Sequence, residues 1–84
     1  MSVPVVLLPE AHRDVTEARD YFEAAVLDRV AVLPELYGEL QPGVRAAGVR
    51  KFGYVVYYRV TPGGVEVLAV LRGSRDPAVW QSRV

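Results

Sequence analysis

The chain has 84 residues, a formal net charge of zero, no cysteine and one histidine. Because 51% of the residues are hydrophobic, we expect a folded chain with one core, forming a single domain over residues 1–84. The lack of cysteine excludes disulfides, thiolate nucleophiles and cysteine zinc sites, and no metal or other cofactor is expected. The apolar run at residues 3–8 is too short to span a bilayer and lacks the features of a signal peptide, so a cytoplasmic location without membrane attachment is expected.

The charges are unevenly distributed along the chain. Up to Leu40 there are eight acidic residues against three arginines, whereas from Gln41 onward two acidic residues face seven basic ones. This polarity either steers an acidic partner onto the second half or simply reflects a solvated acidic helix beside a basic sheet. Both interpretations remain open.

Residues 3–8 predict a short strand, and Pro9 then opens a helix. Apolar residues recur at spacings of three and four from Ala11 to Leu33, which gives one continuous stripe. A straight helix over residues 10–33 would be about 36 Å long, whereas seven-residue strands span about 23 Å. Either the helix bends or splits near residues 24–27, or Val30 and Leu33 overhang the sheet and are covered by a second subunit, as a homodimer through the long helix.

The rest of the chain predicts three further strands. Residues 34–42 form turns, residues 44–51 form a strand weakened by Gly48, and residues 54–60 and 65–71 form a β-hairpin around the turn at residues 61–64. The expected fold is therefore α+β, with an N-terminal strand and a helical region of one long or two short helices packed on an antiparallel sheet of about four strands. Asp76 and Pro77 then suit the start of a short turn through Trp80, and residues 81–84 are expected to fray.

Strict alternation sorts the hairpin side chains into two faces. One face carries Tyr54, Val56, Tyr58, Val60, Val65, Val67, Ala69 and Leu71. The other carries Val55, Tyr57, Arg59, Glu66, Leu68, Val70 and Arg72. Since both faces are apolar in the middle, we expect helices behind the sheet and another layer, such as a partner, in front of it.

Three segments together resemble a known family: RKFGYVVYYRV from Arg50, VLAVL from Val67, and GSRDP from Gly73 followed by Trp80. The opening around Leu8 and Pro9 also matches. The chain resembles the ParE/RelE superfamily of type II toxin–antitoxin toxins, in particular the ParE-like plasmid-stabilisation branch. The resemblance implies a helical hairpin on an antiparallel sheet and a cognate antitoxin that neutralises the toxin. ParE-like members poison DNA gyrase, and RelE-like members cut messenger RNA on the ribosome.

Two departures from the family pattern affect the interpretation. The helical region is shorter, and many relatives carry histidine where this chain has Arg72. For RNA cleavage the candidate catalytic residues are Arg50, Lys51, Tyr57, Arg72 and Arg75, with Arg45 and Arg59 as further phosphate contacts. Trp80 stands where RelE-like toxins often carry tyrosine, and indole cannot act as a general acid. This, together with a pI near 6.6, weakens the nuclease interpretation.

The favoured interpretation is a ParE-like toxin that inhibits growth by binding a protein target such as DNA gyrase. Its expected partner-binding residues are Val55, Tyr57, Arg59, Leu68, Val70, Arg72, Arg75 and Trp80. Structural roles compete at several of them, because Arg59 can pair with Glu66 across the strands, Arg75 can organise a turn with Asp76, and Trp80 can pack on the core. The alternatives are a ribosome-dependent endoribonuclease and a protein-interaction module without toxicity.

Overall fold

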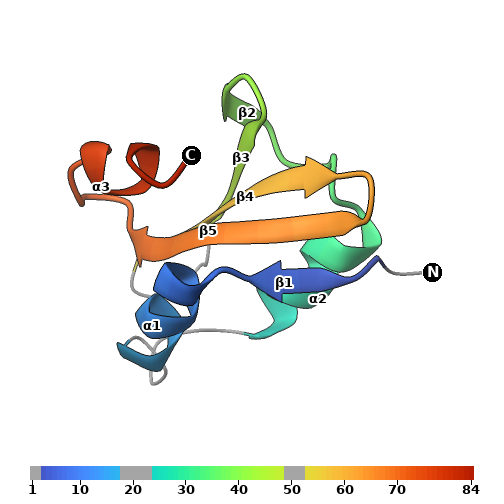
Figure 1. Ribbon diagram of the computed structural model, residues 1–84, viewed down its shortest axis with the longest axis horizontal. Coiled ribbons are helices and arrows are strands. Elements are labelled where there is room, and N and C mark those ends of the chain that lie inside the picture. Colours follow the sequence, from blue (N-terminus) through green and yellow to red (C-terminus); the bar gives the residue numbers. More distant parts are fainter. Residues whose placement is uncertain (1–2, 18–23, 49–52) are drawn as a thin grey trace.

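The computed structural model describes residues 3–17, 24–48 and 53–84, and these form three helices and a five-stranded sheet (Figure 1). The strands are β1 (Val5–Leu7), β2 (Glu39–Gln41), β3 (Val44–Gly48), β4 (Tyr54–Thr61) and β5 (Gly64–Arg72), in the order β1-β5-β4-β3-β2. The predicted α+β fold is confirmed. The sheet is mixed rather than purely antiparallel, because β1 pairs in parallel with β5, and β2 adds a strand within the predicted turns.

The hairpin of β4 and β5 is the longest pairing in the sheet. Its turn brings Thr61 opposite Gly64, and Arg59 lies opposite Glu66, with 2.7 Å between Arg59 Nε and Glu66 Oε1, so the predicted cross-strand ion pair is confirmed. Gly64 has φ 145°, and a Cβ there would collide with the Pro4 carbonyl, which accepts a hydrogen bond from Val65 N at 2.9 Å. Only glycine allows β1 to approach this end of β5 so closely.

A β-bulge in β5 makes the predicted assignment of side chains to the two faces of the sheet wrong for part of this strand. Tyr57 pairs with Ala69 but Tyr58 pairs with Val67, so Leu68 is the extra residue. Because one inserted residue reverses the alternation beyond it, Val70 faces the helices, whereas Ala69 and Leu71 join Leu68 on the other face.

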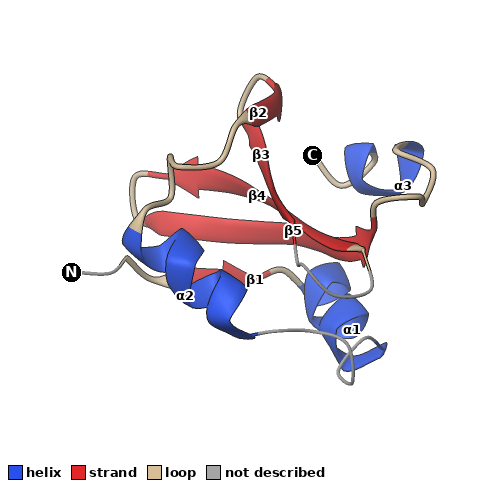
Figure 2. Ribbon diagram, turned by 180° about the vertical axis from the view of Figure 1, so that it is seen from behind, coloured by secondary structure: helices blue, strands red, loops and turns tan. Residues whose placement is uncertain are grey.

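The helical region consists of two helices, α1 (Pro9–Glu17) and α2 (Ala24–Val32), which lie on the same face of the sheet (Figure 2). The single straight helix is therefore wrong, and its length of about 36 Å would exceed the longest dimension of the molecule, 29 Å. Ala11 of α1 and Val26 and Val30 of α2 are fully buried, so Val30 needs no cover from a second subunit. The predicted stripe positions Ala18 and Phe22 lie outside the described residues.

The core behind the sheet is built from both helices and the inner face of the central strands. Its buried members are Ala11, Val26, Val30, Ala47, Val56, Tyr58, Val65, Val67 and Val70. Packing against α1 and α2 thus fixes the positions of β4 and β5.

The front of the sheet is covered by the C-terminal segment. Helix α3 (Ala78–Gln81) lies on the side of β5 opposite to α1 in both overall views (Figures 1 and 2). Trp80, 5% exposed, belongs to a second cluster with Val44, Tyr57, Leu68, Ala69 and Leu71. The helix begins one residue later than expected, with Pro77 at the N-cap, and Asp76 Oδ1 accepts the Ala78 N–H at 3.0 Å.

Candidate partner-binding site

The end of the hairpin forms a pocket of about 130 Å³ in which basic, acidic and aromatic side chains meet. It is lined by Asp14, Glu17, Tyr54, Val70, Leu71, Arg72 and Arg75. The residues come from α1, the start of β4, the end of β5 and the turn after it. Segments far apart in sequence therefore supply one site.

Backbone hydrogen bonds hold the two arginines at the rim of this pocket. Gly73 N donates to Gly53 O at 2.8 Å, which closes the hairpin beyond Arg72, and Arg75 N donates to Arg72 O at 2.9 Å. The Arg72 guanidinium lies over the Tyr54 ring, 5.5 Å from its centroid, as a cation–π contact. The ring and the turn together orient the cationic edge of the pocket.

Arg72 and Arg75 differ from three other arginines of the chain in that they pair with no carboxylate of the described residues. Within residues 3–17, 24–48 and 53–84, the carboxylates pair with Arg45, Arg59 and Arg83, and none pairs with Arg72 or Arg75. Both side chains are exposed. They can therefore receive a carboxylate or phosphate from a partner, because guanidinium groups bind such anions with paired N–H donors.

The phenol expected to serve cleavage is largely covered. Tyr57 is 6% exposed and stacks on Trp80, with 4.9 Å between ring centroids and 12° between ring planes. Burial raises the pKa of Tyr57, so the phenol stays protonated near neutral pH. Tyr54, the phenol in the pocket with Arg72, packs against the core behind the sheet, on the face that alternation predicts it to share with Val56 and Tyr58.

The structure brings together only part of the expected partner-binding set. Arg72 and Arg75 meet at the pocket, Arg59 is held by Glu66, and Val55 is half-buried. Leu68 and Trp80 are buried in the front cluster, and Val70 lies in the core behind the sheet. Arg50 and Lys51 fall outside the described residues, so their positions remain expectations.

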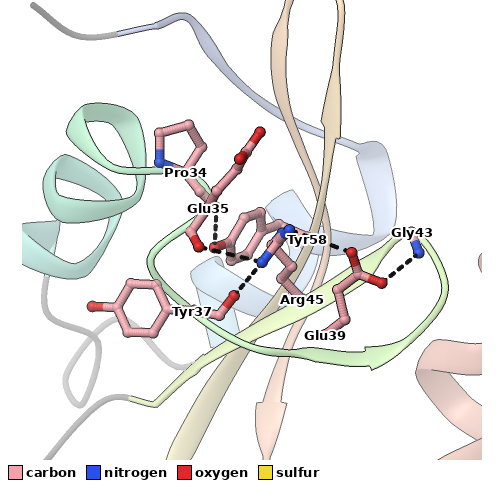
Figure 3. A network of polar contacts seen from close by, with 7 residues as sticks. All are labelled: Pro34, Glu35, Tyr37, Glu39, Gly43, Arg45 and Tyr58. Atoms are coloured by element: carbon pink, nitrogen blue, oxygen red, sulfur yellow. Dashed lines mark hydrogen bonds and ion pairs between the residues drawn. The ribbon is translucent and has the colours of Figure 1, made fainter.

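Arg45, expected as a phosphate contact, serves the connection between α2 and β2 instead (Figure 3). Its Nη1 donates to the carbonyls of Tyr37 at 2.6 Å and Glu35 at 3.3 Å, and its Nη2 lies 3.3 Å from Glu39 Oε1. These bonds occupy the guanidinium within the fold.

Sequence reasoning missed Asp14 and Arg83. Asp14 Oδ2 accepts the Val70 N–H at 3.1 Å and an Arg83 Nη1–H at 2.6 Å. The signal was available, since Asp14 lies three residues after Ala11, at a spacing that places it on the buried side of α1. Arg83 carried no comparable signal, and the expectation that residues 81–84 fray is wrong at this position.

Two further observations concern the described part of the chain. No three His, Asp or Glu side chains gather there as metal ligands would. None of its helices has the length and apolar character that crossing a membrane requires.

Comparison with known proteins identifies the family. No curated protein matches the chain. The family model described as the ParE toxin of the type II toxin–antitoxin system parDE matches residues 5–77, a range that runs from β1 to the turn before α3 and includes the arginine pocket. The chain belongs to the ParE toxin family of type II toxin–antitoxin systems.

Proposed function

We propose that this toxin acts by binding a protein target such as DNA gyrase, that it thereby inhibits growth and stabilises plasmids, and that a cognate antitoxin neutralises it. Gyrase acts in the cytoplasm, so the toxin would act there as well. Family membership supports the toxin role and an antitoxin partner. The choice of a protein target depends on the residues that the structure leaves accessible.

The observation that carries this proposal is the stacking of Tyr57 beneath Trp80. Cleavage of RNA through its own 2′-hydroxyl needs a group that takes a proton and a group that gives one, both within reach of the phosphate. Tyr57 is nearly enclosed and Trp80 can only donate through its indole N–H. Neither residue therefore supplies acid–base chemistry on the front of the sheet, which favours a toxin that acts by binding.

The pocket of Arg72 and Arg75 is the proposed contact for the protein target and for the antitoxin that blocks it. Both guanidinium groups are exposed, and Val70 and Leu71 add an apolar floor. An antitoxin segment that places an acidic side chain beside an aliphatic one would complement this combination.

A ribosome-dependent endoribonuclease is the second candidate, and one contact favours it. Tyr54 lies beside Arg72 in the pocket and so places a phenol close to two cationic groups. In this alternative, Arg72 and Arg75 would neutralise the phosphate charge, Arg50 and Lys51 would assist, and Tyr54 would take the role expected of Tyr57.

The experiment is inducible expression of the chain alone in bacteria, with transcript ends, DNA breaks and plasmid supercoiling measured in the same cultures. Growth arrest with broken DNA and intact transcripts supports the gyrase target, and co-expression of the antitoxin should then restore growth. Arrest with codon-positioned cuts would replace this proposal with the endoribonuclease. Normal growth at full expression would replace both with a non-toxic interaction module.

A further inference from the structure

Three large aliphatic side chains stand exposed together at the C-terminal end of α2. Val32 is 53% exposed, Leu33 54% and Leu36 62%. With Asp28 and Arg29 they line a groove of about 290 Å³, which we call the α2 groove. A cluster of this kind on so small a protein indicates a surface that another molecule covers.

The fold holds this exposed surface in place. The hydroxyl of Tyr58, a fully buried residue, donates to Pro34 O at 2.6 Å, and Arg45 donates to Tyr37 O at 2.6 Å (Figure 3). These anchors lie on either side of Leu36, whose own N–H donates to Leu33 O at 3.0 Å. The groove is therefore preorganised, and covering it costs little ordering of the backbone.

The rim of the groove carries one acidic and one basic residue, so it is electrostatically complementary to the same rim on a second copy. Asp28 and Arg29 are adjacent on α2 and both exposed. In the described part of the chain Asp28 makes no ion pair, and Arg29 uses only Nε, which donates to Tyr37 OH at 3.3 Å. A twofold axis places the same patch on both partners, so each acid can meet the other copy's base.

We propose that the α2 groove is the interface of a homodimer, in which Val32, Leu33 and Leu36 of two copies pack together and Asp28 of each copy pairs with Arg29 of the other. The zero net charge of the chain removes long-range repulsion between copies. An acidic partner segment fits this rim less well, because Asp28 would repel it, and it fits the Arg72 and Arg75 pocket better. The two sites share no residue, so the proposed interface uses none of the residues that line that pocket.

The test is sedimentation velocity of the chain made by cell-free synthesis, which avoids any toxicity, at concentrations up to about 1 mM. The wild-type chain should shift from monomer towards dimer across this range. Leu33→Asp should weaken association by about thirtyfold or more, whereas Leu40→Asp, an equally exposed leucine outside the groove, should not. Circular dichroism confirms that each variant is folded.

Charge reversal tests the arrangement of the two copies. Asp28→Arg alone and Arg29→Asp alone should each weaken self-association by about tenfold. Mixing these two variants should restore association, because one then presents two positive groups and the other two negative ones. This rescue is expected only if the molecule that occupies the groove is a second copy of the chain.

Three results would overturn the proposal. They are a wild-type chain that stays monomeric up to about 1 mM, a dimer that survives Leu33→Asp, and charge variants that do not associate when mixed. A monomer whose α2 groove variants instead lose binding to the antitoxin would assign the groove to that partner.

Discussion

Arg83 and Asp14, 69 positions apart, join the C-terminal segment to the first helix through a 2.6 Å contact between Arg83 Nη1 and Asp14 Oδ2. The same Nη1 donates to Leu68 O at 3.2 Å, and the same carboxylate oxygen accepts Val70 N–H. Pairing between β1 and β5 ends at Val67, so these two side chains satisfy backbone groups of β5 beside the bulge. The ion pair thus supports both the bulge and the covering of the front face.

Replacing Asp14 by alanine should lower the free energy of unfolding by about 3 kcal/mol, because it removes the acceptor of a buried N–H and the partner of a largely buried guanidinium. Urea unfolding measures this loss. Arg83→Ala should cost less, and the double variant should show a coupling energy of about 1 kcal/mol or more. Glu17→Ala, an exposed acid on the same helix, is the control. Additive single losses would show that the two side chains act independently.

Trp80→Ala should lower the free energy of unfolding by about 3–5 kcal/mol, since it removes the ring that stacks on Tyr57 and exposes the front cluster. Trp80→Phe keeps a ring over Tyr57 and should cost less. Because Trp80 is the only tryptophan, its fluorescence in the wild-type chain reports directly on the C-terminal segment. Urea unfolding followed by circular dichroism compares the variants. A loss in Trp80→Ala no larger than that in the exposed control Val84→Ala would show that α3 contributes little.

Alternation and turn chemistry were enough to predict the hairpin, its turn and the Arg59–Glu66 pair, because each depends on local spacing. The bulge could not be predicted from alternation and turn chemistry. Leu68 and Ala69 are both apolar, so nothing in the pattern distinguishes an extra residue from a regular one. As a consequence, four residues were assigned to the wrong face of the sheet: Ala69, Val70, Leu71 and Arg72.

The candidate site was predicted only in part, because some of its contacts depend on tertiary packing rather than on local spacing. The GSRDP motif identified Arg72 and Arg75, and the structure places both at one pocket. The contribution of Tyr54 and Asp14 depends on how α1 meets the end of the hairpin, which spacing along the chain does not encode. The covering of Tyr57 by Trp80 likewise depends on a contact between residues 23 positions apart.

Stability should fall above about pH 10 because burial raises the pKa of both Tyr57 and Tyr58. For Tyr58 the nearby Arg45 charge lowers the pKa and Tyr37 raises it, and burial is the largest cause. Above the ordinary tyrosine pKa of about 10, the unfolded chain releases these protons while the folded chain keeps them. The stabilising contribution is therefore complete below pH 10 and is lost with rising pH, by up to about 1.4 kcal/mol per pH unit for each tyrosine.

Two phenylalanine variants separate the hydroxyl's hydrogen bond from its titration. Tyr58→Phe should cost about 1 kcal/mol at pH 7, because the hydroxyl no longer donates to Pro34 O. Tyr57→Phe should cost little at pH 7. Each of the two variants should reduce the fall in the free energy of unfolding above pH 10, because each removes one titrating phenol. Urea unfolding at pH 7 and at pH 10–11 measures both effects. An alkaline slope unchanged in both variants would assign the loss to other groups.

Replacing Arg72 and Arg75 together by alanine should abolish growth arrest on induction, whichever target the toxin has, because both proposed activities use this cationic rim. Both side chains are exposed, and the contact of Arg72 with Tyr54 is worth about 0.5–1 kcal/mol, so the variant should fold. Lysine at both positions keeps the charge and should restore part of the toxicity, since it lacks the paired donors of guanidinium. Arg13→Ala removes an exposed charge on α1 outside the pocket and should leave arrest intact. Full arrest by a folded alanine variant would place the toxic surface elsewhere on the molecule.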